Sequence, residues 1–260
     1  MTLTPYSVPT VARQSITLAA KPRDLTPIDP DVLRLSVLIP VYNERNTIET
    51  ILDRVRSTPV RKEIICVDDC STDGTRERLG ELHAAGFIDR LIFQDANGGK
   101  GKAIRTALAA STGDVVIVQD ADLEYDPQDW PTLLLPIIEG KADACFGSRF
   151  LGGPHRVLYY WHSVGNRMLT TFSNMLTNLN LTDMETCYKA VRGDLARSLV
   201  LTSDRFGFEP EITARLAQRD ARIYEVPISY AGRTYAEGKK ISWRDGLAAF
   251  WHILKFSLAR

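Results

Sequence analysis

The feature that most constrains the fold is a short run of β-branched residues, Val115-Val116-Ile117-Val118, followed closely by Asp120-Ala121-Asp122. A short, uninterrupted apolar run is typical of a strand that is buried on both faces of a parallel sheet. Such a strand delivers its last residues to the carboxyl edge of the sheet, where open α/β folds bind their ligands. We therefore expect the two carboxylates to lie at a ligand-binding edge.

Two carboxylates separated by one residue can both turn toward one ligand where the chain leaves the strand. Hard oxygen donors suit Mg²⁺ or Mn²⁺, which keep several waters and share oxygens with phosphate groups. The Asp-x-Asp pattern therefore indicates a site for a metal-bound diphosphate. The alternative is an acidic turn in contact with solvent, and the rest of the chain must decide between the two.

Strand-like and helix-like segments alternate along the chain from Leu35 onward. Strands are predicted at residues 35–40, 63–67, 91–93, 115–118, 142–148 and 223–230. Strands that alternate with helices predict an α/β fold with a mostly parallel sheet and helices on both of its faces. We expect residues 35–241 to form this domain and residues 242–260 to form a C-terminal amphipathic helix. Residues 1–34 contain five prolines and no sustained period, which predicts an extended or mobile arm.

The composition excludes several classes of protein. Lys+Arg and Asp+Glu are equal at 32 each, so the chain lacks the overall positive charge that favours nucleic acid as a partner. The four cysteines and four histidines lack the spacing of a zinc site, and reduced thiols predict a cytoplasmic protein. No apolar run approaches the ~20 residues of a membrane span. We also expect no signal peptide, because the N-terminus lacks a charged segment followed by an apolar one.

Carboxylates follow three of the predicted strands. Glu44 follows the first strand, Asp68 and Asp69 follow the second, and Asp120 and Asp122 follow the fourth. The ends of parallel strands meet at one edge of a sheet, so these side chains are expected to line a common cleft. Carboxylates accept hydrogen bonds from base N–H groups and ribose hydroxyls, and with a metal they hold phosphates. Like charges gathered at one edge repel unless cations compensate, which favours a binding site over a set of unrelated turns.

The segment Gly98-Gly99-Lys100-Gly101-Lys102 is a further candidate. It matches neither the phosphate-binding loop GxxxxGK[ST] nor the dinucleotide fingerprint GxGxxG. The absence of GxGxxG after the first strand argues against a dinucleotide-dependent oxidoreductase. Either the lysines and the following helix N-terminus face an anion, or the glycines form a tight turn from strand to helix.

Four motifs occur in a fixed order along the chain: Pro40-Val41-Tyr42-Asn43-Glu44, Val67-Asp68-Asp69-Cys70-Ser71-Thr72-Asp73-Gly74-Thr75, Gly99-Lys100-Gly101 and Asp120-Ala121-Asp122. In this order they resemble the motifs of family 2 glycosyltransferases, which have the GT-A fold. The later segment Gly147-Ser148-Arg149-Phe150 and Arg233 with Gly238-Lys239 resemble the dolichyl-phosphate mannose synthase branch, the polyprenyl-phosphate glycosyltransferases. The resemblance runs from about Leu35 to Lys240.

The resemblance implies a role for each matching residue. The nucleotide-sugar-binding residues would be Pro40, Tyr42, Glu44, Val67, Asp69, Lys100, Asp120, Ala121, Asp122, Arg149, Arg233 and Lys239. The metal ligands, for Mg²⁺ or Mn²⁺, would be Asp122, Glu124 and Asp120, and the catalytic residues would be Asp122, Arg149 and Arg233. The acceptor-binding residues would be Ser163, Arg156 and Arg233, although Tyr159 stands where this family commonly has an arginine.

The resemblance also implies an inverting transfer of a hexose, mannose or glucose, from GDP-mannose or UDP-glucose to a polyprenyl (dolichyl-type) phosphate. A phosphate oxygen is already anionic at neutral pH, so positioning and electrostatic stabilisation would be sufficient. An acceptor hydroxyl on a glycan would instead require a general base, for which Asp183, Glu185, Glu209 and Glu211 are the candidates. A nucleotide-sugar-binding module without turnover is a third possibility.

A lipid acceptor requires contact with a membrane. The segment from Trp243 to Leu258 combines aromatic and basic residues, which is typical of a helix in the membrane interface. Alternatively, its apolar stripe packs on the sheet. The adjacent aromatics Tyr159, Tyr160 and Trp161 suit a second contact. We therefore expect a cytoplasmic protein that makes a peripheral contact with the cytoplasmic face of the membrane.

Overall fold

The structure is a computed structural model that describes residues 26–157, 159–205, 207–234, 237 and 243–258. Most of the predicted N-terminal arm, residues 1–25, lies outside the described residues. The predicted phosphate-binding residue Lys239 also lies outside them.

The described elements alternate between strand and helix in the first half of the chain, as the sequence predicts. In chain order they are β1 (Leu35–Val41), α1 (Ile48–Ser57), β2 (Lys62–Asp68), α2 (Thr75–Ala84), β3 (Arg90–Phe93), α3 (Lys100–Ala110), β4 (Val115–Val118), η1 (Pro127–Asp129), α4 (Trp130–Ile138), β5 (Ala144–Ser148), α5 (Tyr160–Thr177), β6 (Lys189–Arg192), α6 (Gly193–Ser198), α7 (Phe208–Gln218), β7 (Ile223–Pro227) and α8 (Trp243–Leu258).

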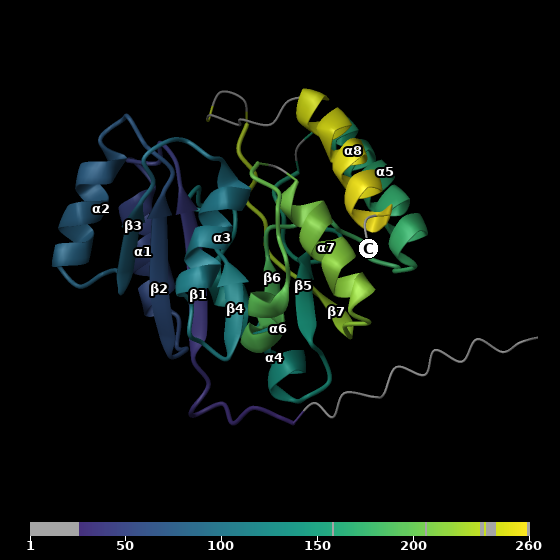
Figure 1. Cartoon of the computed structure of the whole chain (residues 1–260), viewed down its shortest axis with the longest axis horizontal. Helices are drawn as coiled ribbons and strands as arrows, with labels where there is room; N and C mark the ends of the chain where they lie inside the picture. The colour runs from purple at the N-terminus through teal and green to yellow at the C-terminus, as the bar shows by residue number, and fades with distance from the viewer. Residues whose placement is uncertain (1–25, 158, 206, 235–236, 238–242, 259–260) are drawn as a thin grey trace, which may run out of the picture.

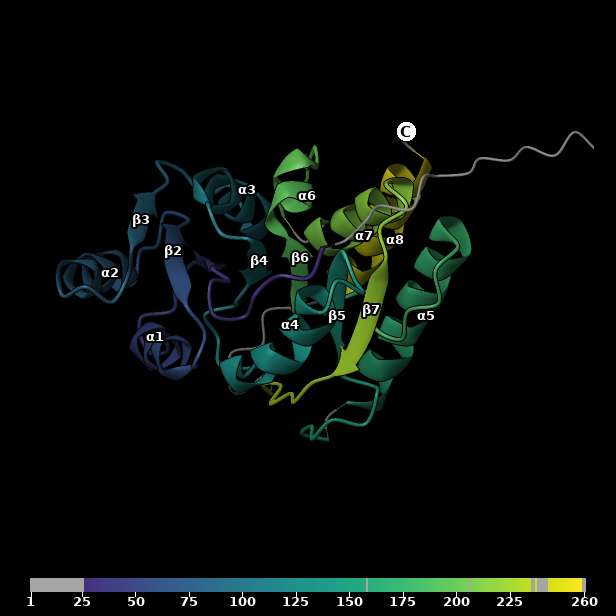
Figure 2. The same ribbon diagram turned by 90° about the horizontal axis from the view of Figure 1, so that it is seen from below.

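The described strands form one seven-stranded sheet in the order β3-β2-β1-β4-β6-β5-β7. The pairings are parallel except those of β6, which runs antiparallel to both β4 and β5. Helices α3, α6 and α7 lie over one face of the sheet, and α1 and α4 lie over the other (Figures 1 and 2). This arrangement confirms the α/β fold with a mostly parallel sheet.

Two short elements were missing from the sequence prediction. Strand β6 has four residues and begins with a lysine, and the six-residue helix α6 follows it directly. A four-residue segment flanked by charges gives too few apolar positions to show a period. The strand forms because β4 and β5 hydrogen-bond to it from both sides.

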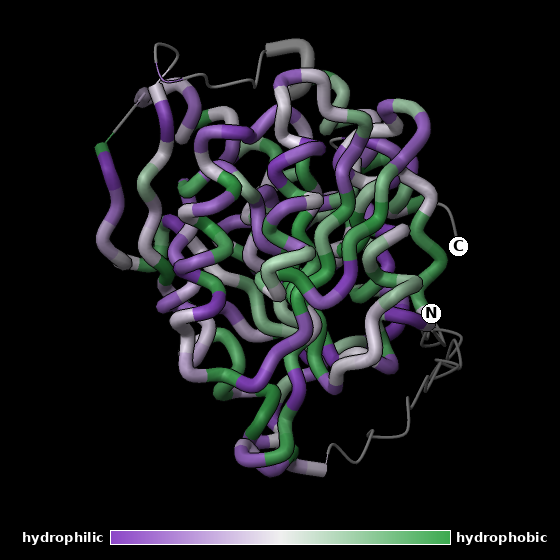
Figure 3. Tube along the Cα trace, turned by 90° about the vertical axis from the view of Figure 1, so that its left-hand side faces the viewer, coloured by the Kyte–Doolittle hydropathy of each residue, from purple (hydrophilic) through white to green (hydrophobic). Residues whose placement is uncertain are grey.

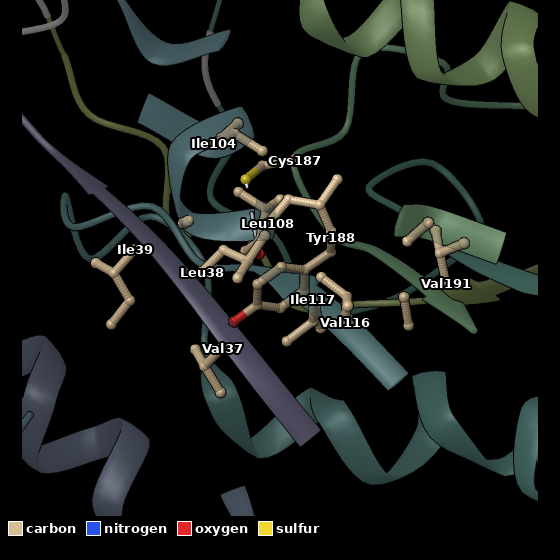
Figure 4. Packing of buried hydrophobic residues seen from close by; sticks show 14 of the residues in the cluster. Val37, Leu38, Ile39, Ile104, Leu108, Val116, Ile117, Cys187, Tyr188 and Val191 are labelled. Carbon is tan, nitrogen blue, oxygen red and sulfur yellow. Dashed lines mark hydrogen bonds between the residues drawn. The ribbon is translucent and has the colours of Figure 1, made fainter. Parts of the chain in front are cut away.

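The core lies where the central strands meet α3, and hydrophobic stretches run through the middle of the molecule (Figure 3). Figure 4 shows this packing with Val37, Leu38, Ile39, Val116, Ile117, Ile104, Leu108 and Tyr188. The Tyr188 hydroxyl donates to Gln119 Oε1 at 2.6 Å, so the one polar group of this ring has a partner inside the core. A rigid core at this place fixes the end of β4, from which the Asp-x-Asp segment leaves.

Helices α5 and α8 lie side by side at the end of the molecule beyond α7 (Figure 1). Between the two helices, the ring centroids of Phe172 on α5 and Phe250 on α8 lie 5.5 Å apart. On α8, Ala249, Ile253 and Phe256 are buried. None of the helices in the described residues has the length and apolar character that crossing a membrane requires.

Candidate active site

The Asp-x-Asp segment lies at the carboxyl edge of the sheet beside the end of β1. Strands β1 and β4 are parallel neighbours, so the segments after Val41 and after Val118 leave the sheet at the same edge. Leu123 has a left-handed backbone with a φ of 65°, which turns the chain directly after Asp122. A side chain with a branched Cγ in this conformation is strained, and such strain gathers at functional sites.

Arg233, from the segment after β7, joins carboxylates of two strand exits. Its Nη2 lies 3.0 Å from Asp122 Oδ2, its Nε lies 3.4 Å from Glu124 Oε1, and its Nη1 lies 3.7 Å from Glu44 Oε1. The backbone N–H of Arg233 also donates to Glu124 Oε1 at 2.9 Å. The structure therefore brings together Glu44, Asp122 and Arg233, which are far apart in the sequence.

The positive charge near the Asp122 carboxyl does not balance the negative charge of the neighbouring carboxylates. Burial raises its pKa to about 7, with further contributions from the Asp120 and Glu124 carboxylates, and Arg233 offsets only part of this. A carboxyl of this kind gains from a nearby cation more than an exposed one does. The local charge therefore suits a divalent metal ion.

Lys100 Nζ lies 2.9 Å from both Asp120 Oδ1 and Glu209 Oε1. Two roles were predicted for the segment Gly98–Lys102, and the structure has the tight turn from strand to helix. The Asp69 carboxylate accepts from the N–H groups of Gly98 and Gly99 at 2.7 Å each, and it thereby fixes the turn. The anion that these glycines bind here is a carboxylate of the chain itself, and the turn aims Lys100 at the Asp-x-Asp segment.

Arg149 is held on the other side of the site, after β5. Its Nε and Nη2 donate to the two oxygens of Asp183 at 2.7 and 2.8 Å. Its guanidinium lies over the Tyr230 ring at 5.1 Å, and the Tyr230 hydroxyl donates to Glu124 Oε2 at 2.7 Å. Burial acts to lower the pKa of Arg149, but the Asp183 carboxylate together with Tyr125 and Tyr230 raises the pKa above its ordinary value. Arg149 and Arg233 are thus connected through Tyr230 and Glu124.

Residues 36–199 match the family model described as glycosyl transferase family 2. The chain belongs to this family. It is 29% identical over 247 residues to an undecaprenyl-phosphate mannosyltransferase from Micrococcus luteus, across 87% of this chain and 99% of that protein. It is 26% identical over 212 residues to a dolichol-phosphate mannosyltransferase from Pyrococcus furiosus, across 80% of this chain and 59% of that protein.

Solved structures confirm the fold. Glucosyl-3-phosphoglycerate synthase from Mycobacterium tuberculosis, in complex with Mn²⁺ and UDP-glucose, superposes with a TM-score of 0.65 at 22% identity, across 88% of this chain and 79% of that one. The same enzyme has been solved with Mg²⁺ and UDP. The GT-A fold predicted for this family 2 chain is therefore confirmed, and the metal ions are properties of the structural neighbour.

The predicted metal ligands differ in how well they fit a metal ion. Asp120 is paired with Lys100, and Glu124 accepts from Tyr230 and Arg233. Among the described residues, no three His, Cys, Asp or Glu side chains converge on a point where a metal would bind. Asp122 fits a hard cation best, because its own partner there is a cation and its pKa is raised. Asp120 and Glu124 would have to exchange their present partners to become ligands.

Of the predicted acceptor residues of this family 2 chain, Arg156 contacts the segment that carries Arg233, and Ser163 lies on α5. Arg156 Nη1 pairs with Glu237 Oε2 at 2.8 Å and donates to the Gly232 carbonyl at 3.3 Å. Ser163 Oγ, on the first turns of α5, donates to the Tyr160 carbonyl at 2.6 Å. Arg156 therefore helps to hold the segment that carries Arg233.

The predicted nucleotide pocket is part open and part core. Tyr42 is exposed and Pro40 is half-buried at the end of β1, whereas Val67 in β2 is buried in the core. Glu44 Oε2 accepts from Thr47 Oγ1 at 2.7 Å. Ala121 is buried between the two aspartates. These residues all lie at or next to the strand exits, and their binding roles stay predictions.

Sequence reasoning missed Tyr230 and gave Asp183 only the role of a possible base. Tyr230 lies three residues before Arg233, in the segment that leaves β7. The signal that located the other site residues, polar groups at strand exits, was present there as well. No local sequence pattern marks Asp183, because its role is to bind Arg149, which is 34 residues away in the chain.

Proposed function

We propose that this family 2 glycosyltransferase moves a hexose, mannose or glucose, from a nucleoside-diphosphate sugar to a polyprenyl phosphate, with inversion at the anomeric carbon. The observation that carries the proposal is the connected pair of arginines around the Asp-x-Asp segment. Arg233 contacts Asp122, and Arg149 stacks on Tyr230, which bonds to Glu124. Transfer to a phosphate brings two anions together, and two guanidinium groups supply matching charge. The names of the two mannosyltransferases above support this acceptor class.

In the proposed reaction an oxygen of the acceptor phosphate attacks the anomeric carbon on the face opposite the diphosphate. The bond from that carbon to the donor diphosphate breaks, and the nucleoside diphosphate leaves with the electron pair. No base is needed, because the attacking oxygen is already ionised near neutral pH. Asp122 would hold Mg²⁺ or Mn²⁺, which stabilises the charge of the leaving diphosphate. Arg233, bound to Asp122 here, would exchange carboxylate oxygens for phosphate oxygens when the donor enters.

A glycan hydroxyl is the second candidate acceptor, and one residue favours it. Three of the four candidate bases are engaged: Asp183 by Arg149, Glu209 by Lys100, and Glu211 by Thr202 and Ser203. Glu185 differs, because its Oε1 is buried and has no hydrogen-bond partner among the described residues. Burial and the Glu209 carboxylate raise its pKa to about 7, a value suited to a general base.

The assay is transfer of a labelled sugar from GDP-mannose or UDP-glucose, with Mn²⁺ or Mg²⁺, to a short polyprenyl phosphate or to glycan acceptors. We expect product on the polyprenyl phosphate, and we expect Asp122→Asn to lower kcat/KM by at least about 100-fold. The matched control is Asp126→Asn, which removes a negative charge at the start of η1 but keeps an acceptor oxygen for the N–H of Gln128. Product on the glycan alone would establish the second candidate, and donor binding without any transfer would indicate a binding module.

A polyprenyl phosphate lies in a membrane, and α5 and α8 present a surface that fits one. Exposed apolar side chains on these helices, which we call the α5–α8 stripe, are between 57% and 77% exposed: Trp161, Met168, Met175, Leu247, Trp251 and Leu258. The three on α5 are seven residues apart, so they lie on one side of that helix. We propose that the stripe rests in the interface of a bilayer.

The charge of the same helices suits anionic lipids, since Arg167 on α5 and Lys255 on α8 are exposed. The predicted packing of α8 on the sheet is not what the structure has, because the inward face of α8, with Ile253 and Phe256, packs on α5 and α7. We expect Trp161→Gln with Trp251→Gln to reduce co-sedimentation with anionic vesicles at least several-fold. Tyr224→Gln, at an exposed aromatic on β7, is the matched control. If the chain forms a dimer and does not bind vesicles, the α5–α8 stripe is a protein interface instead.

A further inference from the structure

A row of charged side chains connects the Asp-x-Asp segment with Arg149. At one end Lys100 bridges Asp120 and Glu209, with 2.9 Å to each. At the other end Asp183 is bound by Arg149 through two guanidinium nitrogens. Both ends contain a residue at the proposed reaction centre. Whatever lies between them is therefore near the place where donor and acceptor must meet.

Glu185 follows Asp183 by two residues, and Lys189 donates to the main chain on both sides of it. The charges of Glu209 at one end and of Arg149 and Asp183 at the other all act on Glu185. Lys189 is fully buried, and its ammonium donates to the main-chain carbonyls of Met184, at 2.8 Å, and Thr186. Its hydrogen bonds therefore fix the turn that carries Glu185, and its charge lowers the pKa of the Glu185 carboxyl without overcoming the effect of burial.

Among the described residues, Glu185 is the carboxylate of the row that has no direct ion pair. Among the described residues the row contains four carboxylates, Asp120, Asp183, Glu185 and Glu209, and three cations, Arg149, Lys100 and Lys189. Oxygen Oε1 of Glu185 is buried without a hydrogen-bond partner in this part of the chain. An unsatisfied buried acceptor is costly, so it calls for a ligand that supplies the missing donor.

We propose that Glu185 accepts a hydrogen bond from a hydroxyl of the transferred hexose and so helps to select the sugar. This inference rests on the proposed function. In the proposed reaction the hexose would lie between the donor diphosphate, beside Asp120 and Asp122, and the acceptor phosphate, which Arg149 would bind once Arg233 has turned to the donor. Glu185 follows Asp183, the partner of Arg149, by two residues, and its Oε1 is buried without a hydrogen-bond partner among the described residues. A sugar hydroxyl donates a hydrogen bond without adding charge, whereas the carboxylate would repel a phosphate.

The experiment compares binding of a sugar nucleotide with binding of the same nucleotide without its sugar, by titration calorimetry in Mn²⁺. The probes are GDP-mannose with GDP, and UDP-glucose with UDP, on the full chain and on Glu185→Gln and Glu185→Ala. We expect Glu185→Ala to weaken the preferred sugar nucleotide roughly 10- to 100-fold, the loss of one charge-assisted hydrogen bond, and to leave the nucleoside diphosphate unchanged. Glu185→Gln, which keeps an acceptor oxygen, should lose less.

A matched control is Glu225→Gln, which removes a carboxylate that accepts from the N–H groups of Thr182 and Asp183 on the same segment. If Glu225→Gln reproduces the sugar-specific loss, the effect comes from the shape of the segment and the proposal fails. A donor that lacks the contacted hydroxyl should bind equally to the wild-type chain and to Glu185→Ala. The hydroxyls of the donor sugar can be removed one at a time. If every such donor keeps the full difference in affinity between the wild-type chain and Glu185→Ala, the proposal is also overturned.

Two further results separate Glu185 from the proposed function. If Glu185→Gln lowers kcat but leaves sugar-nucleotide binding unchanged, Glu185 is a base, and the sugar contact is wrong. If the wild-type chain binds the sugar nucleotide but transfers nothing to polyprenyl phosphate, the proposed function fails, and the binding comparison still decides the role of Glu185. A wild-type chain that binds no sugar nucleotide would overturn both.

Discussion

Replacing Asp183 with Asn should destabilise the chain, because it leaves the buried Arg149 charge without its counter-charge. The Asp183 side chain is 0% exposed and that of Arg149 is 17% exposed. Asp183 accepts from Arg149 N, Nε and Nη2 and from Asn166 Nδ2, at 2.7 to 3.2 Å. Asparagine keeps the size but has one acceptor oxygen, and its amide would place a donor against a donor.

Breaking one partner of a buried ion pair costs about 3–5 kcal/mol. The cost here should be lower, since Arg149 keeps slight solvent contact, the Asn166 oxygen at 3.2 Å and the Tyr230 ring. We expect a loss of about 2–4 kcal/mol in the free energy of unfolding. For a chain of this size, this corresponds to a melting temperature lower by about 4–16 °C.

Urea unfolding of Asp183→Asn, Arg149→Gln and the double variant would measure the coupling between the two residues. The double variant should cost less than the sum of the single variants by at least about 1 kcal/mol, because the second change removes a group that is already unpaired. The control is Glu49→Gln, which breaks a pair with Arg78 in which the side chains are 54% and 34% exposed. That change should cost under about 1 kcal/mol. Equal losses for Asp183→Asn and Glu49→Gln would refute the argument from burial.

Three further predictions concern charge at the site. Burial raises the pKa of Glu185 in the folded state from an ordinary 4.5 to about 7, so deprotonating this carboxyl destabilises the folded chain. The free energy of unfolding of the wild type, relative to that of Glu185→Gln, should therefore fall as the pH rises from about 4.5 to about 7 and stay level above. Urea titrations at each pH measure this difference. Lys100→Met should lower the melting temperature by several degrees, because it leaves Asp120 and Glu209 without their shared cation. EDTA should abolish transfer and Mn²⁺ should restore it, whereas Asp122→Asn should not respond to Mn²⁺.

The sequence predicted the parts of the fold that depend on local pattern. All four residues of the run Val115–Val118 are buried, as its apolar pattern predicts, and β1 and β2, the next two strands on one side of it, are buried at all but one position each. The strand exits were predictable for the same reason, since a parallel sheet places them at one edge. This rule is sufficient to bring Glu44 and the Asp-x-Asp segment to one edge of the sheet.

The pairings inside the site were not predictable, because they join residues with no local relation. Lys100 has its glycine-rich context in the sequence, but Glu209, its second partner, is more than a hundred residues away. Arg233 lies 111 residues from Asp122. The packing of whole elements, here α3 against β1 and β2 and α7 beside α8, determines which of these side chains meet. No single position of the sequence specifies such a pairing.

The excess of carboxylates at the strand ends gives one physical cause for several properties of the site. Glu44, Asp122 and Glu124 all contact the guanidinium of Arg233, and Asp122 still has a raised pKa. A cation that entered with a diphosphate would therefore be held by charge that the fold has already gathered. Arg233 would at the same time become available to a phosphate, so metal binding at Asp122 and anion binding at Arg233 should favour each other.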